Sequence, residues 1–294
     1  MRKKILGLVM VGVMILGLFA GCSSSNETKS DGKADSDKKV LRVGMECAYA
    51  PFNWTQVSDE LANGSKAVKI YGTNEFAYGY DVMMAQKIAD KLGWELEVHK
   101  VEWDSIGMAL DAKKYDCIIA GMGKTEEREQ AYSFTKPYYY RDVCITVKKG
   151  SEFENITKLS EFADKNVKLT TQLGTAWVDL LEQVPDGELG ANYATTAECF
   201  MAVSNGAADA AVIDVPTSQS ALLTNSSLIM LNLDESDTIE DPTGSTNVCI
   251  AVRKDDGTLL GEIQGAMDKI GWGDKAAMDE MMKEAIELQP AANS

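Results

Sequence analysis

The chain has 294 residues, 45% of them hydrophobic and 25% charged, which is typical of a globular protein with one large domain or two lobes. Its formal net charge is −16 at pH 7, which excludes nucleic acid as an expected partner because such a surface repels phosphates. A single histidine and the lack of a CxxC motif argue against structural zinc, and we expect neither a metal nor a cofactor.

The first part of the chain, residues 1–21, has the layout of a secretory signal peptide. A basic start, "MRKK", precedes an apolar run that is shorter than the ~20 residues usually needed to span a bilayer. The run ends in "LFAGC", which resembles the lipobox of bacterial lipoproteins, although Phe19 departs from the usual aliphatic residue. The resemblance implies cleavage before Cys22 and attachment of a lipid such as palmitate to it. The alternative is an uncleaved membrane anchor.

The next segment, residues 22–39, is polar and predicts a disordered tether, because it has too few apolar side chains to form a core. A lipid, a flexible tether and a folded body together predict an exported protein that is lipid-anchored to the outer face of the cell membrane.

Strands and helices alternate after residue 39, which indicates βαβ units with a parallel sheet and helices on its faces. Apolar residues at helical spacing, followed by Gly93 as a stop, predict the helix at 81–92. His99 is expected to be a solvated strand residue. The polar stretch from Pro51 to Gly79 is expected to be a loop or a small excursion on the first lobe. We expect strands at 40–45, 95–100 and 115–122 and helices at 81–92 and 104–114.

A second unit of the same kind follows, and the similar patterns of residues 110–122 and 203–215 predict two similar lobes. Its expected elements are a strand followed by a turn at 167–174, a strand at 208–215 and helices at 175–184, 196–206 and 216–223, with C-terminal helices at 259–271 and 275–288. Two strand-like segments, 142–151 and 246–257, are expected to cross between the lobes. The predicted boundaries are 40–145 for the first lobe, 146–247 for the second, and 248–294 for the return to the first.

Five cysteines remain besides Cys22, an odd number with no close-spaced pair. We expect them to be small buried hydrophobic residues, and the pairing of Cys144 with Cys249 is left open. The five are Cys47, Cys117, Cys144, Cys199 and Cys249.

The first candidate site follows the strand "DCIIA", where Gly121, Met122 and Gly123 form a turn. Thr125 is the expected N-cap of a helix whose first turn holds Arg128. Glycine turns and helix N-termini present N–H groups to anions, and the planar guanidinium matches a carboxylate. The alternative is an ion pair of the arginine with neighbouring glutamates.

The second candidate site lies at the end of the strand "AVIDVP", where the carboxylate of Asp214 suits an ammonium group. The glycine turn in "QLGTAW" offers further N–H groups, at Thr175 and Ala176, to an anion. Anion donors from both lobes and one cation acceptor are together complementary to an α-amino acid.

Four segments, "GYDVMMAQKIADKLG", "WDSIGMALDAKKYDCIIAGMGKTEEREQAYSFTKPYYY", "QLGTAW" and "AVIDVP", resemble polar-amino-acid solute-binding proteins of bacterial ABC importers. The resemblance covers nearly all of residues 40–290. It implies an α/β, two-lobed periplasmic-binding-protein-like fold, in which two βαβ lobes are joined by two hinge strands and the ligand lies in the cleft between them.

The resemblance also implies roles for individual residues. Arg128 would hold the ligand α-carboxylate with backbone amides at Gly123, Thr175 and Ala176, while Asp214 and the carbonyl of Gly121 would hold the amino group. Glu46 would face the ligand side chain. Gly123 stands where the family often has Ser or Thr, so one hydroxyl contact is missing. The remaining expected ligand-binding residues are Tyr49, Phe52, Trp54, Met122 and Gln172.

We therefore expect a monomeric extracellular solute-binding lipoprotein, not an enzyme, that captures a polar amino acid and delivers it to an ABC permease. The acid at Glu46 favours arginine, lysine or glutamine as the ligand. One alternative is an exported dehydratase-like enzyme that acts on a prephenate-type acid, and another is a sensor ectodomain.

Overall fold

The computed structural model describes residues 38–290. The expected signal peptide, Cys22 and almost all of the expected tether lie outside these residues. No helix within the described range has the length and apolar character needed to cross a membrane.

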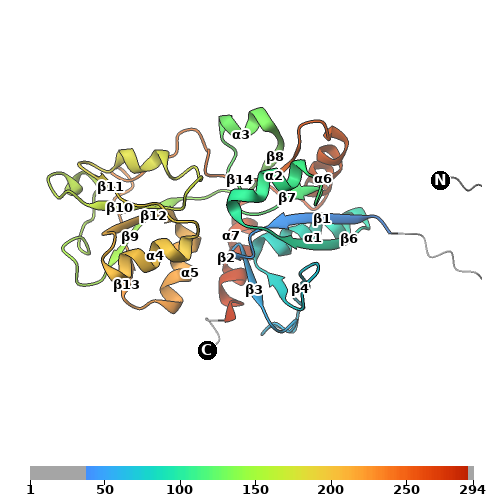
Figure 1. Ribbon diagram of the computed structural model, residues 1–294, viewed down its shortest axis with the longest axis horizontal. Coiled ribbons are helices and arrows are strands. Elements are labelled where there is room, and N and C mark those ends of the chain that lie inside the picture. The colour runs from blue at the N-terminus through green and yellow to red at the C-terminus, as the bar shows by residue number, and fades with distance from the viewer. Residues whose placement is uncertain (1–37, 291–294) are drawn as a thin grey trace, which may run out of the picture. The chain divides into compact units, whose positions relative to one another are not determined.

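A five-stranded sheet organises the first lobe, in the order β6-β1-β7-β14-β8. Its centre is parallel, because β1 pairs in parallel with β6 and β7, whereas β14 is antiparallel to β7 and β8. Helix α1 lies against β1 and β6 (Figure 1). The elements of this lobe are β1 (Val40–Met45), α1 (Tyr80–Leu92), β6 (Glu95–Lys100), η1 (Trp103–Ser105), α2 (Ile106–Asp111), β7 (Cys117–Ile118), α3 (Glu126–Ala131), β8 (Tyr132–Tyr139), β14 (Val248–Arg253), α6 (Gly257–Lys269) and α7 (Lys275–Glu287).

A second five-stranded sheet organises the other lobe, in the order β11-β10-β12-β9-β13. Strand β10 is parallel to β11 and β12, and β9 is antiparallel to β12 and β13. Helices α4 and α5 pack beside β12 and β9 (Figure 1). The elements are β9 (Val143–Lys148), η2 (Leu159–Phe162), β10 (Lys168–Thr170), η3 (Asp179–Gln183), β11 (Glu188–Leu189), α4 (Thr196–Asn205), β12 (Ala210–Asp214), α5 (Val215–Thr224) and β13 (Leu228–Met230).

The stretch between Pro51 and Gly79, which was expected to be a loop or a small excursion on the first lobe, forms short strands. It contributes most of a four-stranded antiparallel sheet, β2-β3-β5-β4, which comprises β2 (Ala48–Tyr49), β3 (Asn53–Gln56), β5 (Phe76–Tyr78) and β4 (Val68–Lys69). Trp54 and Tyr78 are cross-strand partners, and their rings meet edge to face with centroids 5.8 Å apart. Aromatic cross-strand pairs of this kind stabilise short strands.

Other expectations need smaller corrections. The expected helix at 175–184 is only the 3-10 helix η3, and Thr175 before it belongs to a turn in which its hydroxyl donates to the Gln172 carbonyl (2.8 Å). The expected strand at 115–122 pairs in the ladder only as β7. Strand β9 belongs wholly to the second sheet, so the first crossing lies at residues 140–142, slightly before the expected boundary at 145.

Most of the other expected helices and strands lie close to their expected ranges, whereas β8, η2, β11 and β13 had no expected counterpart. Helix α1 ends at Gly93, whose φ of 71° is the left-handed conformation that glycine adopts without steric cost. The five cysteines within the described residues are all buried and free, which confirms the expectation of small buried hydrophobic residues and shows no pairing of Cys144 with Cys249. His99 is hydrogen-bonded to Glu97 at 2.7 Å and only partly exposed.

Candidate functional site

A small cavity lies where the two lobes meet. Its volume is about 10 Å³, which is space for about one water molecule. The first lobe contributes Glu46, Tyr49, Trp103, Ala120, Gly121, Gly123 and Arg128; the second contributes Gln172, Thr175, Ala176 and Trp177; Arg141 comes from the first crossing. The structure therefore brings together most of the residues that the sequence analysis assigned to a ligand site.

Arg128 reaches across the cavity from the start of α3. The Thr125 hydroxyl accepts a hydrogen bond from the Arg128 backbone N–H (3.2 Å), which confirms the expected N-cap. The guanidinium donates to the carbonyl of Gly123 in its own lobe (2.7 Å) and to that of Gly174 in the other lobe (2.8 Å). It also lies 5.2 Å from the ring centroid of Trp103.

The alternative of an ion pair between Arg128 and nearby glutamates is not realised, because no ion pair within residues 38–290 includes Arg128. Burial, together with the nearby positive charge of Arg141, lowers the pKa of Arg128 to about 10. The side chain therefore stays cationic at neutral pH, and both of its hydrogen-bond acceptors are uncharged carbonyls. Such a cation is suited to an incoming carboxylate.

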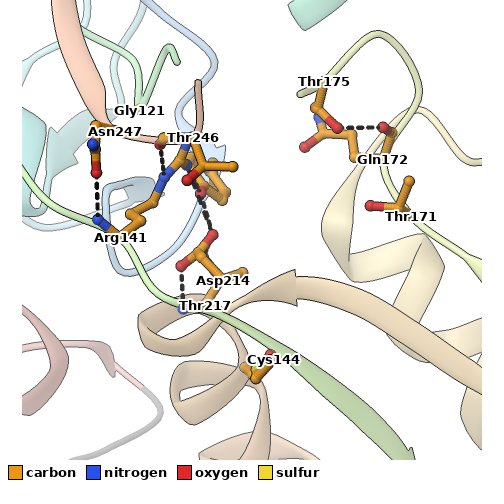
Figure 2. A network of polar contacts seen from close by, with 12 residues as sticks. Gly121, Arg141, Cys144, Thr171, Gln172, Thr175, Asp214, Thr217, Thr246 and Asn247 are labelled. Carbon is orange, nitrogen blue, oxygen red and sulfur yellow. Dashed lines mark hydrogen bonds and ion pairs between the residues drawn. The ribbon is translucent and has the colours of Figure 1, made fainter. Parts of the chain in front are cut away.

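Asp214 ends β12 and caps α5, as Figure 2 shows. One carboxylate oxygen accepts a hydrogen bond from the backbone N–H of Thr217 (2.9 Å), and the other accepts bonds from the Thr217 hydroxyl (3.0 Å) and from the Tyr49 hydroxyl (2.6 Å). The residue is completely buried. Its carboxylate is thus held by groups of both lobes.

Arg141 is the buried cation that faces Asp214, and sequence reasoning missed it. Its Nη1 lies 3.8 Å from the Asp214 carboxylate and donates to the Tyr49 hydroxyl at 2.8 Å. Its Nε donates to the Thr246 carbonyl (2.6 Å), and its backbone N–H donates to the side chain of Asn247 (3.2 Å) (Figure 2). A basic residue directly after the aromatic run "YYY" was the available signal.

The surroundings of Arg141 keep it charged. Burial alone lowers the pKa of Arg141, but the hydroxyl of Tyr49 and the carboxylate of Asp214 outweigh burial and raise the pKa above its ordinary value. The guanidinium also lies between two aromatic rings, 5.6 Å from the centroid of Phe52 and 5.1 Å from that of Trp177. Both crossings and both lobes therefore meet at this side chain.

The aromatic wall of the cavity differs from the expected one. Phe52, Trp54 and Met122 are buried but do not line the cavity. Phe52 stacks on Tyr49 with ring centroids 4.8 Å apart, so it supports the wall from behind. The aromatic side chains that line the cavity are Tyr49, Trp103 and Trp177.

The glycine turn is held by a buried polar chain. The Gly121 N–H donates to the Tyr138 hydroxyl (3.1 Å), which in turn donates to the carboxylate of Asp81 (2.6 Å). Gly121 has a φ of 61°, and a Cβ there would also collide with the ring of Tyr49. Only its carbonyl is therefore left for a ligand, as the sequence analysis assigned it.

Gly123 has a packing reason for lacking a side chain. A Cβ at this position would collide with the Ser245 backbone carbonyl at the second crossing. Gly123→Ala is therefore expected to lower the free energy of unfolding by about 1–3 kcal/mol, the usual cost of overpacking.

Gly261→Ala provides the matched control, because Gly261 lies inside α6 with open space around its Cα. That change is expected to be neutral or to stabilise by up to about 1 kcal/mol. Urea denaturation measures both variants, and equal effects would show that the contact with Ser245 does not constrain Gly123.

Glu46 is an acidic side chain buried in the cavity wall. Burial raises its pKa from 4.5 to about 7, the nearby charges of Glu102 and Asp104 add to the rise, and a hydrogen bond with Gln172 partly opposes it. Protonated and ionised forms are therefore both populated near neutral pH.

The folding stability is expected to fall as the pH rises through about 7, and Glu46→Gln is expected to reduce that fall. A pKa raised in the folded state stabilises the fold fully below the unfolded pKa, near 4.5, and this contribution is lost as the pH rises through about 7. At about 1.4 kcal/mol per pKa unit, the loss amounts to about 3 kcal/mol.

Urea denaturation at about pH 5 and about pH 8 measures this difference. Asp81, whose burial raises its pKa to about 6, supplies a remaining dependence of the same sign. The control is Glu95→Gln, which makes the same substitution at an exposed residue of β6. A slope for Glu46→Gln equal to that of this control would contradict the assignment of Glu46.

Within residues 38–290, no cluster of three His, Cys, Asp or Glu side chains is arranged to hold a metal ion. The site is instead built from charged side chains, aromatic rings and backbone groups.

Comparisons with known proteins identify the family and the fold. Bacterial extracellular solute-binding proteins of family 3 match residues 41–277. The arginine-binding extracellular protein ArtP of Bacillus subtilis is 30% identical over 168 residues, which cover 57% of this chain and 55% of ArtP. The L-cystine-binding protein TcyJ of Escherichia coli is 28% identical over 207 residues, or 70% of each chain.

A solved structure of an amino acid ABC transporter substrate-binding protein from Streptococcus pneumoniae, bound to L-arginine, is 25% identical. It matches 85% of this chain and 95% of its own, with a TM-score of 0.69. An ancestral arginine-binding protein bound to glutamine is 28% identical, covers 85% of this chain and 97% of its own, and has a TM-score of 0.63. The expected two-lobed periplasmic-binding-protein-like fold is thereby confirmed.

Proposed function

Because this chain belongs to family 3 of the bacterial extracellular solute-binding proteins, we propose that it captures a polar amino acid by hinge closure and delivers it to an ABC permease. Family and relatives establish the coarser statement: it is an amino-acid-binding component of an ABC transporter. The class of amino acid, the closure and the delivery are the parts we propose.

One observation carries the proposal. The Arg128 guanidinium spans the cavity, and its hydrogen-bond acceptors within residues 38–290 are two carbonyls, one in each lobe. A ligand carboxylate between the lobes exchanges these neutral acceptors for charge-assisted hydrogen bonds, which are shorter and about twice as strong. The amino acid thereby stabilises the closed arrangement and connects the two lobes.

Hinge motion follows from the size of the cavity. At about 10 Å³ it cannot admit an amino acid, so the lobes must separate for the ligand to enter. Residues 140–142 and the segment around Thr246 are the places where the chain crosses, and both meet at Arg141. The ligand then shifts the population towards closure by as much as its differential affinity for the two states.

A thermal-shift screen of the twenty amino acids tests the proposal. A ligand that binds only the folded state stabilises it by about 2.7 kcal/mol at 100 times its Kd. We expect one or a few polar amino acids to raise the melting temperature. A screen in which none does so would contradict the proposed function.

Membrane attachment is proposed from the lipobox-like "LFAGC". Cys22→Ser is expected to release the full-length protein from bacterial membranes into the medium or periplasm, or to leave it unprocessed, with loss of palmitate labelling. Fractionation and labelling measure both, and Cys47→Ser, a change in the folded body, is the control. Unchanged labelling of the Cys22 variant would contradict lipid attachment there.

Catalysis is not part of the proposal. The enzyme alternative would use Glu46, since a carboxyl with a pKa of about 7 suits a general acid. We expect no turnover of prephenate or arogenate, and product formation by the wild type that Glu46→Gln abolishes would favour the enzyme instead.

A further inference from the structure

Arg141 occupies the position beside Asp214 that sequence reasoning left for the ligand ammonium group. This inference rests on the proposed function, because it concerns the class of amino acid that the same cavity takes. The guanidinium is fixed by the Thr246 carbonyl and the Tyr49 hydroxyl, and its residue is only 8% exposed. The Arg141 side chain is therefore held in a fixed position in the site.

Asp214 has little capacity left for a ligand. A carboxylate offers about four lone-pair positions. Three of them already accept hydrogen bonds, two from Thr217 and one from Tyr49, and Arg141 balances the charge at 3.8 Å. The residue is also completely buried and does not line the cavity. A ligand cation therefore gains little here.

The charged groups that line the cavity are Arg128, Arg141 and Glu46, so guanidinium groups outnumber carboxyls. Trp177 adds a further donor, because its buried Nε1 has no hydrogen-bond partner among the residues that the structure describes. The ligand side chain therefore meets donors and positive charge. Asp214 offsets part of the charge of Arg141 at 3.8 Å, but it does not line the cavity. A cationic side chain would therefore face two guanidinium groups in a poorly solvated site, which is unfavourable.

We propose that Arg141 is a specificity-determining residue that selects amino acids with an anionic side chain, aspartate or glutamate, over arginine and lysine. Arg128 takes the α-carboxylate, and Arg141 with Trp177 takes the side-chain carboxylate. The ligand ammonium group is left to the Gly121 carbonyl and to Glu46. This ranking is the reverse of the one expected from Glu46 alone.

The acidic surface makes the test more demanding. A net charge of −16 attracts cations from a distance, so a preference for glutamate must arise locally. Moderate salt screens charges farther than about 8–10 Å away and leaves the local preference in place.

The test is titration calorimetry with glutamate, glutamine and arginine at moderate salt, on the wild type and on Arg141→Gln. We expect the wild type to bind glutamate at least about tenfold more tightly than arginine, and Arg141→Gln to weaken glutamate binding by about 10- to 100-fold. In the same variant, arginine binding should weaken less than glutamate binding or should improve. The preference for glutamate over arginine is then lost or reversed.

Two further variants make the result interpretable. Arg42→Gln removes the same charge from the first lobe, where Arg42 pairs with Asp116 away from the cavity, and should leave the ranking unchanged. If the single variant Arg141→Gln does not fold, the double variant Arg141→Gln/Asp214→Asn replaces both charges of the pair with neutral side chains. It should show the same change in the ranking of glutamate and arginine.

Arginine ranked first by the wild type, or equal losses for glutamate and arginine in the Arg141 variants, would overturn this inference and leave the proposed function intact. Failure of every amino acid to bind the wild type would overturn both.

Discussion

Arg128→Ala is expected to weaken amino-acid binding at least about 100-fold while both lobes remain folded. Hydrogen bonds to charged groups contribute about 1.5–3 kcal/mol each, and the variant loses a two-pronged contact to the ligand carboxylate. It also loses the bonds to the Gly123 and Gly174 carbonyls, so the lobes lose one of their direct connections.

The folded state should survive because Arg128 lies on a six-residue helix at the cavity and none of its side-chain bonds belongs to a sheet. Titration calorimetry gives the affinity, and circular dichroism checks the fold. Arg128→Lys should recover part of the affinity, since the charge remains but the planar fork is lost. Lys124→Ala, which removes an exposed charge from the same loop, is the control. Near-normal affinity in folded Arg128→Ala would refute the assignment.

Asp214→Asn is expected to lower the free energy of unfolding by about 3 kcal/mol without any ligand. Arg141 would then be a buried cation without its compensating charge, and breaking a buried pair costs about 3–5 kcal/mol. Asparagine keeps only one accepting oxygen, so it can cap the Thr217 N–H or accept from the Tyr49 hydroxyl but not both, and the expected loss includes that hydrogen bond as well as the charge.

Asp116→Asn is the matched control. Asp116 pairs with Arg42 at 2.6 Å, but the Arg42 side chain is 40% exposed, so we expect a loss of about 1 kcal/mol or less. Urea denaturation of both variants gives the comparison. If Asp214→Asn costs no more than this control, the pair with Arg141 does not stabilise the fold as the structure indicates.

Local patterns made much of the fold predictable. The ranges of β1, α1 and β6 followed from alternation, helical periodicity and Gly93, all of which act within one segment. The capping of α3 by Thr125 and the place of Arg128 were predictable for the same reason, because a cap needs only a few consecutive residues.

Contacts between distant segments were not predictable in this way. Arg141 meets Tyr49, Asp214 and Thr246, which come from three other parts of the chain, so no spacing in the sequence indicates the meeting. Tyr49 lines the cavity as expected, but the other two expected aromatic residues, Phe52 and Trp54, do not, for the same reason. Trp54 lies near Tyr49 in sequence, but its ring packs on Tyr78 in the small sheet.

The cavity walls are formed instead by Trp103 and Trp177, which flank it from opposite lobes. The small sheet itself escaped prediction because its strands are only two to four residues long and are stabilised by pairing rather than by a periodic apolar pattern.

A crystal structure grown with the amino acid that gives the largest thermal shift tests the central claim most directly. The account predicts that the ligand lies between the lobes, with its α-carboxylate within hydrogen-bond distance of both terminal nitrogens of Arg128 and the two sheets drawn together around it. An amino acid bound outside this cleft, or one whose carboxylate does not contact Arg128, would contradict the account.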